Sequence, residues 1–154
     1  MKSQLRGIYA ITDSELLTGA KLLPGVEAAL KGGAAVVQYR DKSHHQQRRY
    51  DVALALNQLC QRYGVPLIIN DDADLAAKVG AAGVHIGKED GEYQSARSIL
   101  GAEAIIGVSC YNSLDLALSA QQAGADYIAF GRFFPSTIKP NAVHATPGLL
   151  TEAR

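Results

Sequence analysis

The stretch Ala35-Val36-Val37-Gln38-Tyr39-Arg40-Asp41-Lys42 begins as an apolar, strand-like run and ends in polar and charged side chains. The same change recurs along the chain, at 67–72, 83–90, 105–110 and 127–139. In a parallel sheet the carboxyl ends of all strands lie at one edge, so the polar groups that follow the strands are expected to converge there. The chain therefore predicts a parallel α/β sheet with a functional edge.

Strands and helices are expected to alternate over the whole chain. The predicted strands are 7–12, 35–40, 66–70, 83–86, 105–109 and 126–131, and the predicted helices are 24–31, a long one capped by Ser43 and ended by Gly64, 74–79, 93–100, 114–123 and a short one that begins at Thr146 and Pro147. Glycine-alanine pairs such as Gly33-Ala34 separate helix from following strand, as a helix cap and tight turn. This repeat is typical of a (β/α)8 TIM barrel.

An open doubly wound sheet is the alternative architecture. Such a sheet usually has a glycine-rich, phosphate-binding turn after its first strand, and this chain has Ile11-Thr12-Asp13-Ser14 there. A closed barrel has eight units and typically about 250 residues, whereas about six units are present here. We therefore expect one incomplete TIM-barrel domain over residues 1–154, with unpaired edge strands that favour association of the chain with copies of itself.

Composition excludes several classes of partner. Fifteen basic residues balance fifteen acidic ones, so the chain has no net field to attract nucleic acid or a membrane surface. Its two cysteines, Cys60 and Cys110, are not at a metal-binding spacing and are expected to be reduced thiols. No leader peptide or long apolar span is visible, so we expect a cytoplasmic protein that acts on small molecules.

The residues after the second and third strands suggest a polyanion and a metal ion. Gln38 and Arg40 share one face of a strand because side chains alternate, and Lys42 follows just past the edge. Arginine and lysine together suit a phosphate group, although a solvated charged loop is the alternative. Asp71 follows the third strand and Asp90 ends the loop after the fourth, so the two carboxylates are expected to face one another, and such a pair is a usual way to hold Mg²⁺. Formation of a turn by Asp90-Gly91 is the alternative.

Other polar residues are more ambiguous. Asp72 is expected to cap a helix, and His85 to be a hydrogen-bonded core histidine, since no second histidine or cysteine stands at ligand spacing. Ser109 ends a strand, where it is suited to donate to a substrate or to remain purely structural. Lys139 lies in a long loop and is expected to contact phosphate together with the hydroxyls of Ser136 and Thr137.

Six segments together resemble the thiamine-phosphate synthase family. They are Tyr9-Ala10-Ile11-Thr12-Asp13, Gln38-Tyr39-Arg40-Asp41-Lys42, Ile69-Asn70-Asp71-Asp72, Gly83-Val84-His85-Ile86-Gly87-Lys88-Glu89-Asp90, Gly107-Val108-Ser109-Cys110 and Phe130-Gly131-Arg132-Phe133-Phe134-Pro135-Ser136. They occur in the family's order across the whole chain, and their combination is specific although no single segment is.

The resemblance implies a TIM-barrel transferase that joins hydroxymethylpyrimidine pyrophosphate to hydroxyethylthiazole phosphate and releases pyrophosphate by a dissociative mechanism with the help of Mg²⁺. It implies that Asp71 and Asp90 hold the metal ion and that the substrates contact the segment 38–42, including Tyr39 and Asp41, and the loop 136–139, including Ile138. Gln38 and Ser109 would hold the aminopyrimidine. The remaining implied roles are pyrophosphate binding by Arg40, Lys42, Asn70 and Lys139, thiazole phosphate binding by Ser136 and Thr137, and catalysis by Arg40, Lys42, Ser109 and Lys139.

The chain departs from the family pattern at two places. Ile138 stands where the family commonly has a threonine, which removes one phosphate-binding hydroxyl. The seventh and eighth strands and their glycine-rich phosphate loops are not present in the sequence. A thiazole tautomerase of the same superfamily is one alternative function, and a non-catalytic fragment or assembly partner is another.

Overall fold

A computed structural model describes residues 5–87, 93–134 and 143–153. The strands are β1 (Ile8–Ile11), β2 (Ala34–Tyr39), β3 (Leu67–Asn70), β4 (Gly83–Ile86), β5 (Ile105–Tyr111) and β6 (Tyr127–Phe130). The helices are α1 (Leu22–Lys31), α2 (Gln46–Arg62), α3 (Ala73–Val79), α4 (Tyr93–Leu100), α5 (Leu114–Ala123) and α6 (Pro147–Glu152), with a 3-10 turn at Gly19–Lys21. No helix within the described ranges is long and apolar enough to cross a membrane.

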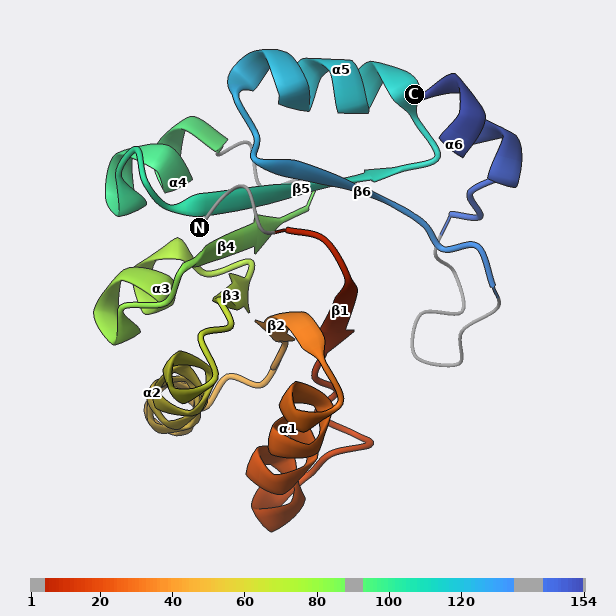
Figure 1. The fold of residues 1–154 in the computed structure, drawn as a ribbon. Coiled ribbons are helices and arrows are strands. Elements are labelled where there is room, and N and C mark those ends of the chain that lie inside the picture. The colour runs from red at the N-terminus through yellow and green to blue at the C-terminus, as the bar shows by residue number, and fades with distance from the viewer. Residues whose placement is uncertain (1–4, 88–92, 135–142, 154) are drawn as a thin grey trace.

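The six strands form one parallel sheet in the order β1-β2-β3-β4-β5-β6. Figure 1 shows this sheet curled into part of a barrel, with α1 to α5 covering its outer face. The strand order follows the chain without the reversal that defines a doubly wound sheet, so the TIM-barrel prediction is confirmed and the alternative is wrong. The curl brings the carboxyl ends of the strands around one common interior.

Alternate residues of the strands separate two apolar regions. Val37 and Ile69, each 1% exposed, face outward and pack with residues of α1, α2 and α3. Val36, Ile68 and Ile105 face inward and form the floor of the barrel interior, next to the partly buried Tyr9 and Tyr127. Because both faces of these strands are covered, their sequences are apolar without a break, as in other parallel sheets.

Local signals predict several helix ends correctly. Asp72 caps α3, because its Oδ1 accepts from the backbone N–H of Leu75 at 2.8 Å. Thr146 is the N-cap of α6 and Pro147 its first residue, as predicted. The prediction for Ser43 is wrong: α2 begins at Gln46 after His45, and the N–H of Ser43 donates to Asp41 in the preceding turn.

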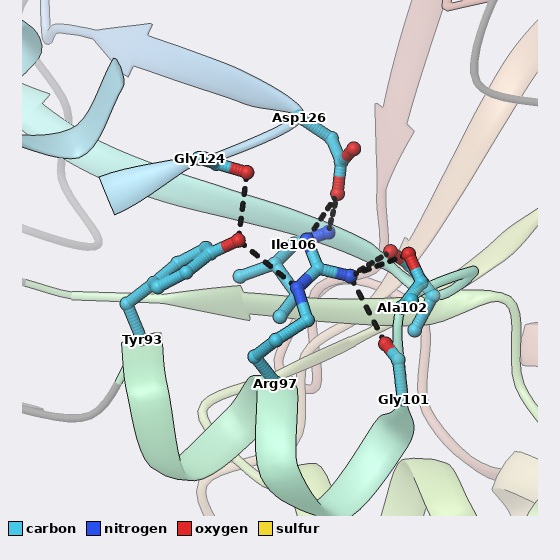
Figure 2. Close-up of polar contacts among 8 residues, drawn as sticks. Tyr93, Arg97, Gly101, Ala102, Ile106, Gly124 and Asp126 are labelled. Atoms are coloured by element: carbon cyan, nitrogen blue, oxygen red, sulfur yellow. Dashed lines mark hydrogen bonds and ion pairs between the residues drawn. The ribbon is translucent and has the colours of Figure 1, made fainter. Parts of the chain in front are cut away.

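A polar cluster around Arg97 fastens the amino ends of β5 and β6 to α4 (Figure 2). The guanidinium pairs with Asp126 at 2.8 Å, and the same carboxylate oxygen accepts from the N–H of Ile106. The hydroxyl of Tyr93 accepts from Arg97 and donates to the carbonyl of Gly124 at 2.7 Å.

The guanidinium of Arg97 also donates to three backbone carbonyls at the end of α4 and in the turn after it, those of Gly101, Ala102 and Ala104. These bonds lie at the sheet edge opposite the strand carboxyl ends, so they stabilise the barrel without entering the interior.

Replacing Arg97 with alanine is expected to lower the free energy of unfolding by about 2 kcal/mol, because Asp126 and several carbonyls lose a charged donor at a partly buried position. Arg62→Ala is the matched control, since Arg62 is the exposed basic residue in the last turn of α2. Chemical denaturation of both variants measures the difference. Equal stabilities of the two would contradict this role for Arg97.

Candidate active site

All six strands contribute to a cavity of about 670 Å³ in the curl of the sheet. Its polar lining comes from β1 (Tyr9), β2 and the residue after it (Gln38, Arg40), β3 (Asn70), β4 (His85), β5 (Ser109, Tyr111), β6 (Tyr127) and the segment after β6 (Arg132). Most of these residues are at or near the carboxyl ends of their strands. The predicted convergence of polar groups is therefore confirmed for the described strands.

Gln38 and Arg40 lie on the same side of β2 and its extension, as their spacing predicts. Gln38 is 3% exposed, and its backbone carbonyl accepts from the backbone N–H of Thr12 at 2.9 Å. The buried Thr12 accepts in turn, through its hydroxyl, from the N–H of Arg40 at 3.0 Å. These two bonds continue the pairing of the two strands past the end of β2, so the backbone that carries Arg40 is held beside the cavity.

Lys42, Asn70 and Asp71 meet at the rim. The ammonium of Lys42 lies 3.7 Å from Asp71 Oδ2, and the amide of Asn70 donates to the same oxygen at 2.6 Å. The side chains of Lys42 and Asp71 are 60% and 39% exposed, so this ion pair adds little to stability. Its consequence is the placement of a cation, an amide and a carboxylate at one point, where Asn70 lines the cavity together with Arg40.

The backbone at Asp71 is held in an unusual conformation. Its φ is +61°, in the left-handed region that few residues other than glycine, asparagine and aspartate adopt. The N–H of Asp71 donates to the carbonyl of His85 at 2.8 Å, which ties the end of β3 to β4. Backbone strain of this kind is common where a side chain must be aimed at a ligand.

Asp71 fits the predicted magnesium site in its chemistry. Mg²⁺ is usually bound by one or two carboxylates together with water and phosphate oxygens, and Asp71 offers an exposed carboxylate at the cavity rim. The described residues contain no cluster of three or more histidine, cysteine, aspartate or glutamate side chains, so a site made wholly from them is not indicated. Asp90, the second predicted ligand, lies outside the described residues, and the assignment stays a prediction.

Tyr39 and Asp41 do not line the cavity. Tyr39 is 3% exposed and packs in the outer core, because it alternates with Gln38 along β2. Its hydroxyl donates to Asp41 at 3.1 Å, and Asp41 accepts from the N–H of Ser43 at 2.8 Å. The two residues shape the turn after β2, and the substrate contact that the resemblance implies for them stays a prediction. Four further predicted site residues, Ser136, Thr137, Ile138 and Lys139, lie outside the described residues.

Tyr9, His85 and Tyr127 line the cavity although none of them is among the predicted site residues. The amide nitrogen of Gln38 donates to the hydroxyl of Tyr9 at 2.8 Å, and the hydroxyls of Tyr9 and Tyr127 are 2.6 Å apart. Tyr127 bonds His85 Nδ1 at 3.0 Å, and His85 Nε2 bonds the hydroxyl of Ser109 at 2.8 Å.

The prediction of a hydrogen-bonded core histidine is correct, since His85 is 8% exposed, but it misses that this core faces a cavity. The available signal is the strand alternation, which places His85 on the side opposite Val84 and Ile86.

Comparison with known proteins shows the family of this chain. A family model described as "Thiamine monophosphate synthase" matches residues 8–154. A thiamine-phosphate synthase of Nitrosococcus oceani is 56% identical over all of this chain and 71% of its own length. One from Marinobacter nauticus is 54% identical over all of this chain and 70% of its own length.

A solved structure extends the agreement to the fold. The thiamine phosphate pyrophosphorylase of Pyrococcus furiosus superposes with a TM-score of 0.79 at 34% identity, over 93% of this chain and 67% of that one. The resemblance of the six segments is thus confirmed over nearly the whole chain. The chain belongs to the thiamine monophosphate synthase family, whose members are transferases.

Proposed function

We propose that this protein is a thiamine-phosphate synthase that joins 4-amino-2-methyl-5-hydroxymethylpyrimidine pyrophosphate to 4-methyl-5-(2-hydroxyethyl)thiazole phosphate. The products are thiamine phosphate and pyrophosphate. The observation that supports this most is the meeting of Gln38, Arg40, Asn70 and Ser109 on one cavity, in a chain that belongs to the family. Neutral hydrogen-bonding groups inside the cavity suit a heterocycle, and charged groups at its rim suit a pyrophosphate.

The pyrimidine binds deepest in this proposal. Gln38 is buried on β2 and Ser109 stands near the end of β5, so both point polar atoms into the same cavity. The amide of Gln38 and the hydroxyl of Ser109 bind the amino group and a ring nitrogen. The aromatic ring of Tyr127 lies beside His85, with centroids 5.6 Å apart, and gives the ring of the substrate an apolar wall.

The pyrophosphate is held at the rim. Arg40 binds it with its forked guanidinium, and Lys42 and Asn70 add a point charge and an amide donor. Asp71 and Asp90 would hold a Mg²⁺ ion, which would supply positive charge to neutralise the leaving pyrophosphate.

The reaction then needs no nucleophile from the protein. The bond between the methylene carbon and the pyrophosphate oxygen breaks, and its electron pair leaves with the pyrophosphate. The lone pair of the thiazole nitrogen forms the new bond to that methylene carbon. Arg40 and Lys42 contribute by stabilising the negative charge as it develops on the leaving group. A thiazole tautomerase only moves a proton, so it has no use for this set of cations.

The direct test is formation of thiamine phosphate. The protein, supplied with both substrates and Mg²⁺, should release thiamine phosphate and pyrophosphate in equal amounts, and omission of either substrate should stop both. A well-folded protein that binds neither substrate would contradict the proposal. Self-association, cytoplasmic location and the single-domain boundary remain predictions.

Arg40→Ala and Gln38→Ala should distinguish binding of the pyrophosphate from binding of the pyrimidine ring. Arg40→Ala is expected to weaken binding of the pyrophosphate ester by about 10- to 100-fold, because a charged hydrogen bond is worth roughly 1.5–3 kcal/mol. It should leave the free pyrimidine alcohol almost unaffected, whereas Gln38→Ala should weaken both ligands. Calorimetric titration of both ligands measures this, and equal losses for both in Arg40→Ala would refute the division of roles.

A further inference from the structure

The bonds from Gln38 to Ser109 form one unbroken chain through the cavity wall. Its links are Gln38 to Tyr9, Tyr9 to Tyr127, Tyr127 to His85 and His85 to Ser109, at 2.6–3.0 Å. The five residues come from β2, β1, β6, β4 and β5. Each inner member has one proton to donate, so the direction of one bond determines the direction of all the others.

The donor and acceptor of each hydrogen bond follow from Gln38, at one end of the series. Its amide nitrogen donates to Tyr9, so the proton of Tyr9 is left for Tyr127. Tyr127 then donates to Nδ1 of His85, and the neutral imidazole carries its proton on Nε2. That proton is donated to the oxygen of Ser109.

Two observations indicate that the side chains in this series of hydrogen bonds are uncharged. Burial raises the pKa of both Tyr9 and Tyr127, so each phenol keeps its proton. A doubly protonated His85 would donate to Tyr127 as well as to Ser109, and the hydroxyl of Tyr127 would then receive two donors and lose its own acceptor. Within these four bonds, the neutral tautomer with the proton on Nε2 gives each donor an acceptor.

We propose that Tyr9, Tyr127 and His85 are positioning residues that order the protons of Gln38 and Ser109, and so make the cavity select an amino-substituted pyrimidine. With the amide nitrogen turned to Tyr9, the carbonyl oxygen of Gln38 remains as the acceptor for the ligand. With its oxygen accepting from His85, Ser109 donates its own proton to the ligand. This inference rests on the proposed function, because it concerns the same pyrimidine site.

An acceptor and a donor together match an aminopyrimidine. Its amino group donates and the neighbouring ring nitrogen accepts. The 4-oxo analogue has the opposite pattern, with an accepting oxygen and a donating ring N–H. Its binding would require every bond of the chain to reverse and the proton of His85 to move to Nδ1. The hydrogen-bond series therefore discriminates between the amino and the 4-oxo pyrimidine, through residues that lie behind the two that contact the ligand.

Nitrogen NMR of the histidine-labelled protein tests the proton order without any ligand. The two ring nitrogens of His85 have distinct shifts when one is protonated, and His85→Gln identifies its signals among those of the four histidines. We expect a protonated Nε2 and a bare Nδ1. A protonated Nδ1 would overturn the inference and leave the proposed function intact.

Tyr127→Phe tests the selectivity, with Tyr63→Phe as the matched control. Both changes remove one hydroxyl, but Tyr63 is at the outer surface, where it bonds Glu27. Tyr127→Phe should reduce the preference for the amino over the 4-oxo pyrimidine pyrophosphate by about tenfold, the value of one lost hydrogen bond in the chain. It should also shift the His85 ring signals, and Tyr63→Phe should change neither.

Titration of both pyrophosphate esters in the presence of Mg²⁺ gives the preference. An unchanged preference in a Tyr127→Phe protein that still binds the amino ligand would overturn the inference alone. Failure of the unaltered protein to bind either ester would overturn the proposed function and this inference with it.

Discussion

Asp71→Asn is expected to reduce turnover by about a thousandfold, because loss of a carboxylate ligand to Mg²⁺ removes about 4 kcal/mol of stabilisation from the leaving pyrophosphate. The fold should survive. Asparagine tolerates the left-handed backbone at this position, where φ is +61°, and its side-chain oxygen can still accept from Asn70. The ion pair with Lys42 is exposed at 60% and 39%, so its loss has little effect on stability.

Turnover measured against magnesium concentration checks this result. Asp74→Asn is the matched control, because it makes the same change of charge three residues away, in the exposed first turn of α3. The Asp71 variant should need far more Mg²⁺ and never reach the normal rate, while the Asp74 variant should behave normally. Near-normal turnover of Asp71→Asn at limiting Mg²⁺ would remove Asp71 from the metal site.

Gly107→Ala should damage both the stability of the barrel and the pyrimidine site. A Cβ at this position of β5 would overlap the ring carbons and the hydroxyl of Tyr127. The ring would have to move, and its bonds to Tyr9 and His85 would break. We expect the free energy of unfolding to fall by about 3 kcal/mol, the upper range for overpacking, and affinity for the pyrimidine to fall more than tenfold.

Gly148→Ala provides the comparison for this change. Gly148 is in α6, and a Cβ there would meet no atom within 4 Å. This variant should be as stable as the parent or slightly more so, since alanine suits a helix better than glycine. Denaturation and calorimetric titration of both variants decide the matter, and a Gly107→Ala protein with normal stability and affinity would show that Tyr127 is not held by this contact.

Local sequence signals predicted the elements well where they act within a few residues. The bounds of α5 are those predicted, 114–123, because Ser113 caps its first turn and Gly124 ends it in a left-handed conformation. Strand β5 runs two residues beyond its predicted end, to Tyr111, because its pairing with β6 continues past a shift in register after Ser109. Pairing between distant strands leaves no local mark in the sequence.

In the candidate site, too, local sequence signals predicted some features and missed others. The two-residue period of a strand was enough to put Gln38 and Arg40 on one face. The same period places Tyr39 on the opposite face, where the structure packs it in the outer core, yet the family resemblance grouped it with its neighbours. Alternation along the strand was the better guide to the direction of that side chain.

The order of strands and helices, the edge at which polar residues gather, and the family could all be predicted from the amino-acid sequence, because they depend on periodicity, caps and motifs along the chain. Which of these residues meet depends on the folded arrangement of the whole sheet. Tyr9 and Tyr127 are 118 positions apart, and their hydroxyls come within 2.6 Å because the sheet curls and brings β1 opposite β6 across the interior. The curl results from the twist of all six strands together, so no single segment encodes the contact.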